Sequence, residues 1–528
     1  MKLLLVTGVL AEKTVERYAK ESKIETSVLA LKVPVAALLS PEQIAKVLKK
    51  TDVRDFDVIL VPGLIRGDTS VIADSLGKPA FKGPRYAADL PTVLDALGRV
   101  KLSTVTPACD LLRKELQQKA LQELEAVEKN RDVLLQKPGN MLIGELAVGK
   151  DFPMRVLAEI VDAALMPNDE IQRLAKHFVK MGADVIDVGM VAGESRPSDA
   201  KRAVEAVKKA VNVPVSIDTL DPDEIEETVA AGADLILSAD AGNVEQIAPF
   251  AADVAVVVIP TNQREGYFPA KAEDRIRFLE EIMEKARRLG MKRLIGDLIL
   301  EPSNVLESLV AFRDFAVRNP EVPLFVGVSN VTELFDADSV GINSLLARLS
   351  SEVNASMLLA TEKSSKAKGT VREEAIASKM MFLAKRRGSV PKDLGIDLLV
   401  LKDKRNYEEA YDKTLEADAK VTITDEGAEP AALDPKGVFK ISVDRNAKNI
   451  VALHFATAEA DKPNDIIKGE TAEAVYTKIV ELELVTRLDH VAYLGSELAK
   501  AEIALKTGKE YVQDSALFKN DNELPPNR

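Results

Sequence analysis

The sequence is poor in residue types that many catalytic and structural sites require. Its 528 residues include one cysteine (Cys109), no tryptophan and three histidines. A single cysteine excludes an intramolecular disulfide and a cysteine-ligated zinc site, and it fits a reducing, cytoplasmic setting. Acidic residues outnumber basic ones by 84 to 71, and the net charge of −13 argues against general nucleic-acid binding. No apolar run approaches the length of a membrane span, so we expect no membrane association.

Short apolar runs alternate with amphipathic helical patterns from Met141 to about Arg387. Continuous apolar runs are typical of parallel strands that are buried on both faces, and the helical segments between them supply the crossovers. This α/β pattern predicts a central (β/α)8 TIM barrel. The eight runs cover residues 141–146, 184–189, 213–218, 234–238, 254–259, 293–300, 323–330 and 355–360.

Composition and turn signals divide the chain into four segments. Two buried strands near the amino terminus, each followed by a glycine-containing turn, predict a Rossmann-like α/β domain. Alternating runs at 438–444 and 449–455, followed by two helical patterns, predict a small α+β domain with a hairpin. The predicted segments are an N-terminal domain at 1–136, the barrel at 140–390, a strand and connector at 395–432, and a C-terminal domain at 433–516.

Polar residues follow the predicted barrel strands at their carboxyl ends, the edge where such barrels bind substrates. Asp218 and Asn330 end the third and seventh runs, and Asp297 lies within the sixth run, at the predicted end of its strand. A carboxylate accepts two adjacent N–H donors, as a 2-amino-4-oxo pyrimidine edge presents them, and an asparagine supplies both a donor and an acceptor. These residues favour recognition of a nitrogen heterocycle over hydrolysis. Further candidates at the same edge are Glu145, Asp187, Asp240 and Asn262.

Two other readings of these acids stay open. An aspartate at a strand end is often the cap of the following helix, and Asp218 could cap the helix that starts near Asp221. Glu145, Asp187, Asp218 and Asp297 could also approach one another closely enough to hold a metal ion. No spacing demands a metal, and we assign none.

The middle domain resembles the pterin-binding barrel that dihydropteroate synthases and pterin-dependent methyltransferases share. Residues 182–189 with 193–197 are similar to the second-strand motif of the synthases. Residues 215–219 with 232–236 are similar to their third and fourth strands. The three-part layout resembles the archaeal dihydropteroate-synthase-like proteins. The resemblance implies a reduced pterin of the folate or methanopterin type as substrate.

The anion-handling positions depart from the synthase pattern. The synthases carry an Asn after strand one, Ser-Arg-Lys after strand seven and Arg-x-His after strand eight. This chain has Glu145, Ser329-Asn330 and Glu362-Lys363 there, and Arg196 and Lys363 are the candidates to replace the missing cations. The substituted residues instead resemble the methyltransferase branch, with Gly-Glu on the first strand and Ser-Asn on the seventh.

The resemblance therefore favours methyl transfer from an N5-methyl-tetrahydropterin, with Asn330 and Asp218 as catalytic residues. Methyl acceptance would need a corrinoid or a thiol on a partner, and His454 and His490 are the C-terminal candidates for an axial ligand. One alternative is a Mg²⁺-dependent dihydropteroate synthase that condenses hydroxymethyl-dihydropterin diphosphate with an arylamine. Another is a non-catalytic pterin carrier or assembly protein, and each reading allows a homodimer. The residues assigned to the pterin are Asp218, Asp297, Asn330, Glu145, Asp187, Asp240 and Asn262.

Overall fold

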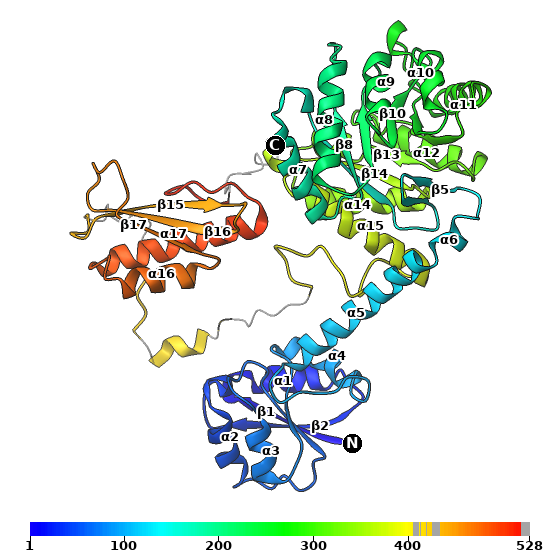
Figure 1. Ribbon diagram of the computed structural model, residues 1–528. Helices are drawn as coiled ribbons and strands as arrows, with labels where there is room; N and C mark the ends of the chain where they lie inside the picture. Colours follow the sequence, from blue (N-terminus) through cyan, green and yellow to red (C-terminus); the bar gives the residue numbers. More distant parts are fainter. Residues whose placement is uncertain (405–410, 412, 419, 425–432, 519–528) are drawn as a thin grey trace, which may run out of the picture. The chain divides into compact units, whose positions relative to one another are not determined.

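The computed structural model describes residues 1–404, 411, 413–418, 420–424 and 433–518 (Figure 1). The chain forms two compact units, which are described separately. The first unit holds the N-terminal domain and the barrel, and the second holds the C-terminal module and two loops that follow barrel strands. Their bounds are Met1–Val331, Val340–Ala360 and Val371–Tyr411 for the first, and Thr332–Ser339, Thr361–Thr370 and Asp412–Arg528 for the second.

The N-terminal domain is a four-stranded parallel sheet with apolar cores on both faces, as the apolar strand patterns predict. Ser40 and Gln43 form a capping box that fixes the start of the second helix. In spatial order the strands are β2 (Glu25–Leu31), β1 (Lys2–Gly8), β3 (Val58–Val61) and β4 (Ala80–Lys82). The helices are α1 (Glu12–Ala19), α2 (Pro41–Leu48), α3 (Ser70–Leu76) and α4 (Leu90–Asp95).

Eight parallel strands confirm the predicted barrel. Strands that follow one another in the chain lie side by side, β14 returns to pair with β7, and a bridge between Gly296 and Leu324 closes the ring. The strands are β7 (Arg155–Ile160), β8 (Val185–Gly189), β9 (Val215–Asp218), β10 (Leu235–Ala239), β11 (Ala255–Val258), β12 (Arg293–Gly296), β13 (Phe325–Val326) and β14 (Met357–Thr361).

Helices surround the barrel and bury the outward side chains of the strands in one continuous apolar core. A second, smaller core fills the inside of the barrel. The surrounding helices are α7 (Asn168–Met181), α8 (Pro197–Ala210), α9 (Pro222–Ala230), α10 (Val244–Ala251), α11 (Ala272–Arg288), α12 (Val305–Arg318), α14 (Ser339–Glu352) and α15 (Thr370–Arg387), with the short α13 (Ser329–Thr332) after β13.

The prediction for the first barrel strand is wrong. Residues 141–146 belong to an antiparallel hairpin of β5 (Asn140–Ile143) and β6 (Leu146–Gly149), and the first barrel strand is β7. Arg293 and Arg155, which begin β12 and β7, donate hydrogen bonds to the hairpin carbonyls of Leu142 and Ala147. The hairpin therefore lies at the amino ends of the strands, and its apolar side chains close the floor of the barrel.

The predicted strand at 395–402 is also wrong, because residues 395–404 form neither helix nor strand. A Cβ on Gly395 would lie 2.2 Å from the carbonyl oxygen of Leu116, so this segment packs closely against α5 (Ala108–Lys129) instead of pairing with a strand. The short α6 (Arg131–Leu134) follows α5. Most of the predicted connector up to residue 432 lies outside the described residues.

The C-terminal module is an antiparallel sheet with two helices packed against it, so the predicted α+β domain and its hairpin are confirmed. The third strand, β17, was not predicted. The elements are β15 (Val438–Asp444), β16 (Asn449–Phe455), β17 (Asp465–Gly469), α16 (Ala472–Glu481) and α17 (Leu488–Thr507). Among the helices of the described ranges, none combines the length and apolar character that a bilayer crossing requires.

Candidate functional site

Four carboxyl groups lie at or near the carboxyl ends of barrel strands. Glu159, Asp187 and Asp218 lie on β7, β8 and β9, and Asp297 directly follows β12. Carboxyl ends of parallel barrel strands meet at one rim, where the active sites of this fold are found. We call this rim the mouth. Asp221, and not Asp218, accepts the capping hydrogen bonds of α9, so the helix-cap reading of Asp218 is wrong.

Burial and mutual repulsion weaken the acidity of the mouth carboxyl groups. Burial raises the pKa of Asp187 well above its usual value, and the nearby charges of Asp218 and Glu159 add to this effect. Burial also raises the pKa of Asp218 to about 6. For Asp297, burial and then the charge of Asp218 raise the pKa to about 7, although a backbone hydrogen bond and Arg275 oppose the rise. A mouth with these groups favours hydrogen-bond donors and cations over anions.

The loop that presents Asp297 is held from two sides. Its carboxylate Oδ1 accepts a hydrogen bond of 2.7 Å from the backbone of Ile299, which has a left-handed φ of 62°. That conformation is strained for a β-branched residue, so surrounding contacts must maintain it. The buried Arg275 donates to the carbonyl of Ile299 and pairs with Glu301. Arg275 therefore fixes the backbone beside Asp297.

Asn330 lies on the short helix α13 after β13. Its amide nitrogen is 3.4 Å from the carbonyl oxygen of Leu300, in the loop that follows Asp297. A Cβ on Gly327 would lie 2.8 Å from the same amide nitrogen, so a glycine is needed for Asn330 to occupy this position. Asn330 and Asp297 are thus joined through one loop, as their predicted positions at neighbouring strand ends require.

Asp240 and Asn262 follow the neighbouring strands β10 and β11, but their side chains differ in how many hydrogen-bond partners they have. The Asp240 carboxylate accepts four hydrogen bonds, from the backbone of Gly242, Asn243 and Gln263 and from the Thr261 hydroxyl. These bonds occupy its acceptor capacity, so Asp240 anchors the two loops and does not fit the predicted ligand role.

The side-chain oxygen of Asn262 is buried and has no hydrogen-bond partner in the part of the chain that the structure describes. A buried, unsatisfied amide oxygen is costly unless another group donates to it. Asn262 therefore remains a candidate to hydrogen-bond a ligand.

Glu145 is placed far from the mouth, which corrects its predicted ligand role. It lies at the turn of the floor hairpin, with a side chain that is 98% exposed and an ion pair to Arg131. Glu159 holds the corresponding first-strand position instead, and sequence reasoning missed it. The signal was the apolar run at 155–160, which ends in Glu-Ile in the same way as the other strands end in polar residues.

The two anion-binding candidates have other partners. Arg196 precedes α8 and forms ion pairs with Glu194 and Asp199, which offset its charge. Lys363 lies in the second compact unit, where its backbone nitrogen donates to the carboxylate of Glu333. Arg196 belongs to the first unit and Lys363 to the second.

The two C-terminal histidines are engaged within their own module. The ring nitrogens of His454 contact the carboxylate of Asp465 and the carbonyl of Lys436. The Nδ1 atom of His490 is buried without a hydrogen-bond partner among the described residues and lies 3.4 Å from the carboxylate of Asp434. His454 is therefore held through both ring nitrogens, and the axial-ligand role of either histidine stays a prediction.

Comparisons with known proteins cover all three parts of the chain. A family model described as pterin binding enzyme matches residues 161–363. Two further models match residues 1–85, as a family of unknown function (DUF6513), and residues 433–514, as PterinBD-DUF4346. The dihydropteroate synthase structure of Yersinia pestis aligns with 18% identity and a TM-score of 0.37, over 48% of this chain and 100% of that one.

One sequence relative spans nearly the whole chain, and another matches a short segment of it. A Ycf91-like protein of Nostoc is 37% identical over 106 residues, which are 16% of this chain and 84% of that protein. The protein "Uncharacterized protein MJ0107" of Methanocaldococcus jannaschii is 41% identical over 98% of this chain and 99% of its own length. The chain therefore belongs to the same family as the M. jannaschii protein, an archaeal dihydropteroate-synthase-like family built around a pterin-binding barrel.

Proposed function

We propose that the mouth binds a reduced pterin and transfers a methyl group from its N5 atom to an acceptor. One observation carries the proposal: Asp297 is buried, Asp218 is partly buried, and the charge of Asp218 acts on Asp297 across the mouth. Among the described residues, the one hydrogen bond to either carboxyl group comes from Ile299. The remaining acceptor positions suit the amino and ring N–H groups of a pterin, which a carboxylate binds in pairs.

Methyl transfer requires that the pterin nitrogen become a good leaving group. A methyl on a neutral tertiary amine is a poor electrophile, so N5 is protonated before the transfer. The nucleophile of the acceptor then attacks the methyl carbon, the N5–carbon bond breaks, and its electron pair stays on N5. Asn330 would accept a hydrogen bond from the protonated N5, and Asp218 would hold the ring. The acceptor would be a corrinoid or a thiolate on a partner protein.

Methyl transfer is preferred to condensation because of the charges at the mouth. A dihydropteroate synthase must bind and release a diphosphate, which calls for cationic side chains in addition to Mg²⁺. Arg196 is already paired with two carboxylates, and the mouth itself is acidic. A non-catalytic pterin carrier is the third candidate, and it would use the same carboxyl groups for binding alone.

Isothermal titration calorimetry would separate the three candidates. The ligands are a tetrahydropterin, its N5-methyl form, and a hydroxymethyl-dihydropterin diphosphate with Mg²⁺. We expect the N5-methyl form to bind and the diphosphate to bind more weakly. Preference for the diphosphate, with diphosphate release on adding an arylamine, would establish the synthase instead. Binding without turnover by any acceptor would indicate a carrier, and binding of none would refute a pterin site.

We expect Asp297→Asn to weaken tetrahydropterin binding by about 1.5–3 kcal/mol at pH 8, the typical contribution of a charged hydrogen bond. The pKa of about 7 means that the wild-type carboxylate is mostly ionised at pH 8 and protonated below pH 6. Wild-type affinity should therefore rise with pH through about 7, and the variant should lose this step and keep only the rise near pH 6 that belongs to Asp218. Calorimetry between pH 5.5 and 8.5, in buffer with a chelator, measures both effects.

The matched control is Glu145→Gln, which removes a predicted ligand that the structure places on the floor hairpin. Its affinity for the tetrahydropterin should equal that of the wild type. Equal binding by Asp297→Asn and the wild type would mean that Asp297 only supports the loop of Ile299.

A further inference from the structure

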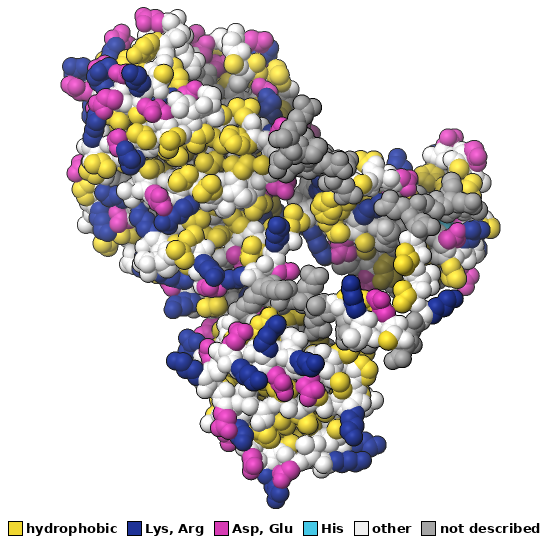
Figure 2. Space-filling view, turned by 180° about the vertical axis from the view of Figure 1, so that it is seen from behind, with side chains coloured by type: hydrophobic (Ala, Val, Ile, Leu, Met, Phe, Trp, Pro, Cys, Tyr) yellow, Lys and Arg dark blue, Asp and Glu magenta, His cyan; other side chains and the backbone are white. Residues whose placement is uncertain are grey.

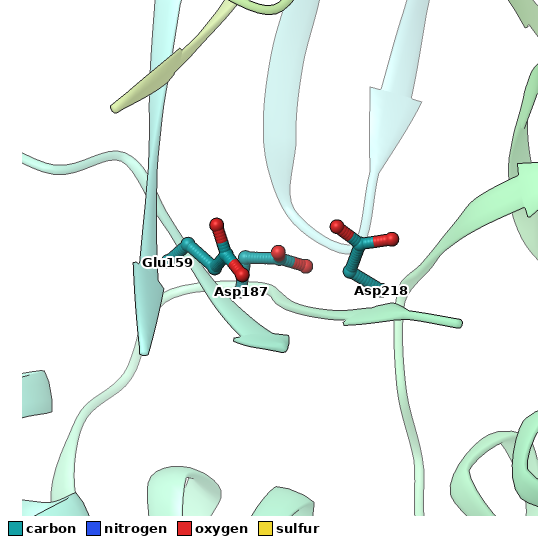
Figure 3. A group of neighbouring side chains, drawn as sticks. All are labelled: Glu159, Asp187 and Asp218. Atoms are coloured by element: carbon teal, nitrogen blue, oxygen red, sulfur yellow. The ribbon is translucent and has the colours of Figure 1, made fainter. Parts of the chain in front are cut away.

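Three carboxyl groups meet on the inner face of adjacent strands at the mouth (Figure 3). Glu159 on β7 pairs in register with Asp187 on β8, and Asp218 ends β9 beside Gly189 of β8. One carboxylate oxygen from each of the three residues lies within 4.8 Å of the others. Three strands of the barrel scaffold therefore fix three oxygen atoms around one point.

Asp187 is the central member, and its carboxyl group lies between those of Glu159 and Asp218 (Figure 3). Its side chain is fully buried, and Oδ1 accepts a hydrogen bond from the hydroxyl of Ser216. Its Oδ2 atom is buried without a hydrogen-bond partner among the residues that the structure describes. A buried carboxylate oxygen without a partner is costly, so the arrangement favours a ligand that completes it.

The backbone makes room for this arrangement at Gly189. A Cβ at this position would lie 2.3 Å from a carboxylate oxygen of Glu159. Only a glycine leaves Glu159 in its observed position beside Asp187. The space for the third carboxyl group is thus part of the strand itself and does not depend on a mobile loop.

We propose that Glu159, Asp187 and Asp218 bind a divalent cation that prefers oxygen ligands, of the size of Mg²⁺ or Mn²⁺. Carboxylate oxygens are the ligands such ions take, and water fills the remaining positions. A double positive charge would offset the mutual repulsion of three carboxylates, of which that of Asp187 is buried and the other two are partly buried. The site goes beyond the proposed function, because it needs no pterin, although it shares Asp218 with the pterin site.

The test is titration of the full-length protein with Mn²⁺, after treatment with EDTA and desalting. Electron paramagnetic resonance reports the free ion. We expect one tightly bound Mn²⁺ per chain, displaced by excess Mg²⁺. Glu159→Gln should weaken this binding at least tenfold, and so should Gly189→Ala, which displaces the Glu159 carboxylate without changing charge. Glu145→Gln on the floor hairpin is the matched control and should bind Mn²⁺ as the wild type does.

The proposal is overturned if the wild type binds no stoichiometric Mn²⁺, or if Glu159→Gln and Gly189→Ala bind it as tightly as the wild type does. The three groups would then share protons instead of a metal ion. Circular dichroism melts confirm that each variant is folded before its titration is interpreted. Tetrahydropterin binding measured in EDTA is a separate readout, so failure of the cation site and failure of the pterin site are distinguishable.

Discussion

At the scale of the residue, the most unusual group outside the mouth is Glu374 on α15. Its side chain is fully buried, and neither carboxylate oxygen has a hydrogen-bond partner among the described residues. Burial, with a smaller effect from the charge of Glu373, raises the pKa of Glu374 well above its usual value. An acid whose pKa is higher in the folded state costs stability once the pH exceeds its unfolded pKa.

We expect Glu374→Met to increase the free energy of unfolding by about 1–3 kcal/mol at pH 7, because it removes an unpaired polar group from an apolar place. The gain should shrink as the pH falls towards the unfolded pKa of about 4.3, below which the carboxyl group becomes neutral in both states. Urea unfolding at pH 7 and pH 4.5 measures the difference. Glu281→Gln, on an exposed position of α11, should change neither value. A destabilised Glu374→Met would mean that the carboxyl group has a favourable partner, such as water.

Individual residues also show which parts of the candidate site could be predicted from the sequence. Asp218, Asp297 and Asn330 were predictable at the mouth because each lies at the predicted end of a strand, and strand ends converge on one rim. Asp240 looks the same in sequence, yet four hydrogen bonds make it a loop anchor. Which acceptors are already satisfied depends on three-dimensional neighbours, and one sequence does not contain that information.

At the scale of the element, the loop after β12 depends on a residue of α11. Arg275 reaches across to the carbonyl of Ile299, the hydroxyl of Ser308 and the carboxylate of Glu301. Its guanidinium group also lies 4.4 Å from the ring centroid of Phe268. One side chain thus joins the helix to the loop that carries Asp297, and its loss should release the strained backbone of Ile299.

We expect Arg275→Met to destabilise the protein by at least about 2 kcal/mol, because it leaves buried carbonyl oxygens and Glu301 without their donor. Hydrogen exchange at the amide of Ile299 should become faster than in the wild type. Arg313→Met, which removes an exposed ion pair with Asp314, is the control and should leave both quantities unchanged. Unaltered exchange in Arg275→Met would show that Asp297 alone holds the loop.

The wrong prediction of the first barrel strand has its cause in how secondary-structure elements pair. The apolar run at 141–146 has the length and composition of a barrel strand, but a glycine turn folds it into a hairpin. The run at 155–160 begins with an arginine and contains a glutamate. Because of these two charged residues, it does not show the continuous apolar pattern that predicts a buried strand. An apolar run shows that a strand is buried, but it does not show which neighbours pair with it. The same limit explains the false strand at 395–402, where Ile396 and Leu398 pack against the barrel core and the next three apolar residues, Leu399, Val400 and Leu401, are exposed.

At the scale of the whole molecule, the three parts of the chain are separately built, each with its own core. Figure 2 shows basic and acidic side chains interspersed over the visible face, so no broad region of one sign marks this face for a polyanion. The fold class of each part was predictable from the pattern of its apolar residues, which is continuous in the parallel strands and alternating in the C-terminal hairpin. How the parts combine in function was not, because that depends on surfaces and not on periodicity.

Within the C-terminal module, Asp434 joins the segment before the sheet to the start of α17. Its carboxylate accepts hydrogen bonds from the backbone of Lys436, Thr486 and Arg487 and from the Thr486 hydroxyl. Although burial opposes ionisation, these backbone and side-chain bonds hold the pKa of Asp434 well below its usual value. A depressed pKa contributes stability above the unfolded pKa of about 3.9, and this stability is lost as the pH falls further.

We expect Asp434→Asn to destabilise the C-terminal module by about 1.5–3 kcal/mol at pH 7. The barrel should be unaffected, since the contacts lie within one module. Hydrogen exchange of the full-length protein, followed separately for α17 and for the barrel strands, measures both. The difference from the wild type should diminish below about pH 4. Asp461→Asn, on an exposed position between β16 and β17, is the control, and slower or equal exchange in Asp434→Asn would refute the anchor.

The floor hairpin offers a place to attach the protein to a surface or a dye. Its turn residue Glu145 is solvent-exposed and lies at the opposite end of the barrel from the mouth. The native thiol, Cys109, is half-buried, and burial raises its pKa, so it should react slowly with maleimides at neutral pH. Glu145→Cys would therefore direct coupling to the floor and keep the anchor away from ligands that enter at the mouth. Sensor-chip and single-molecule experiments become possible without first removing the native cysteine.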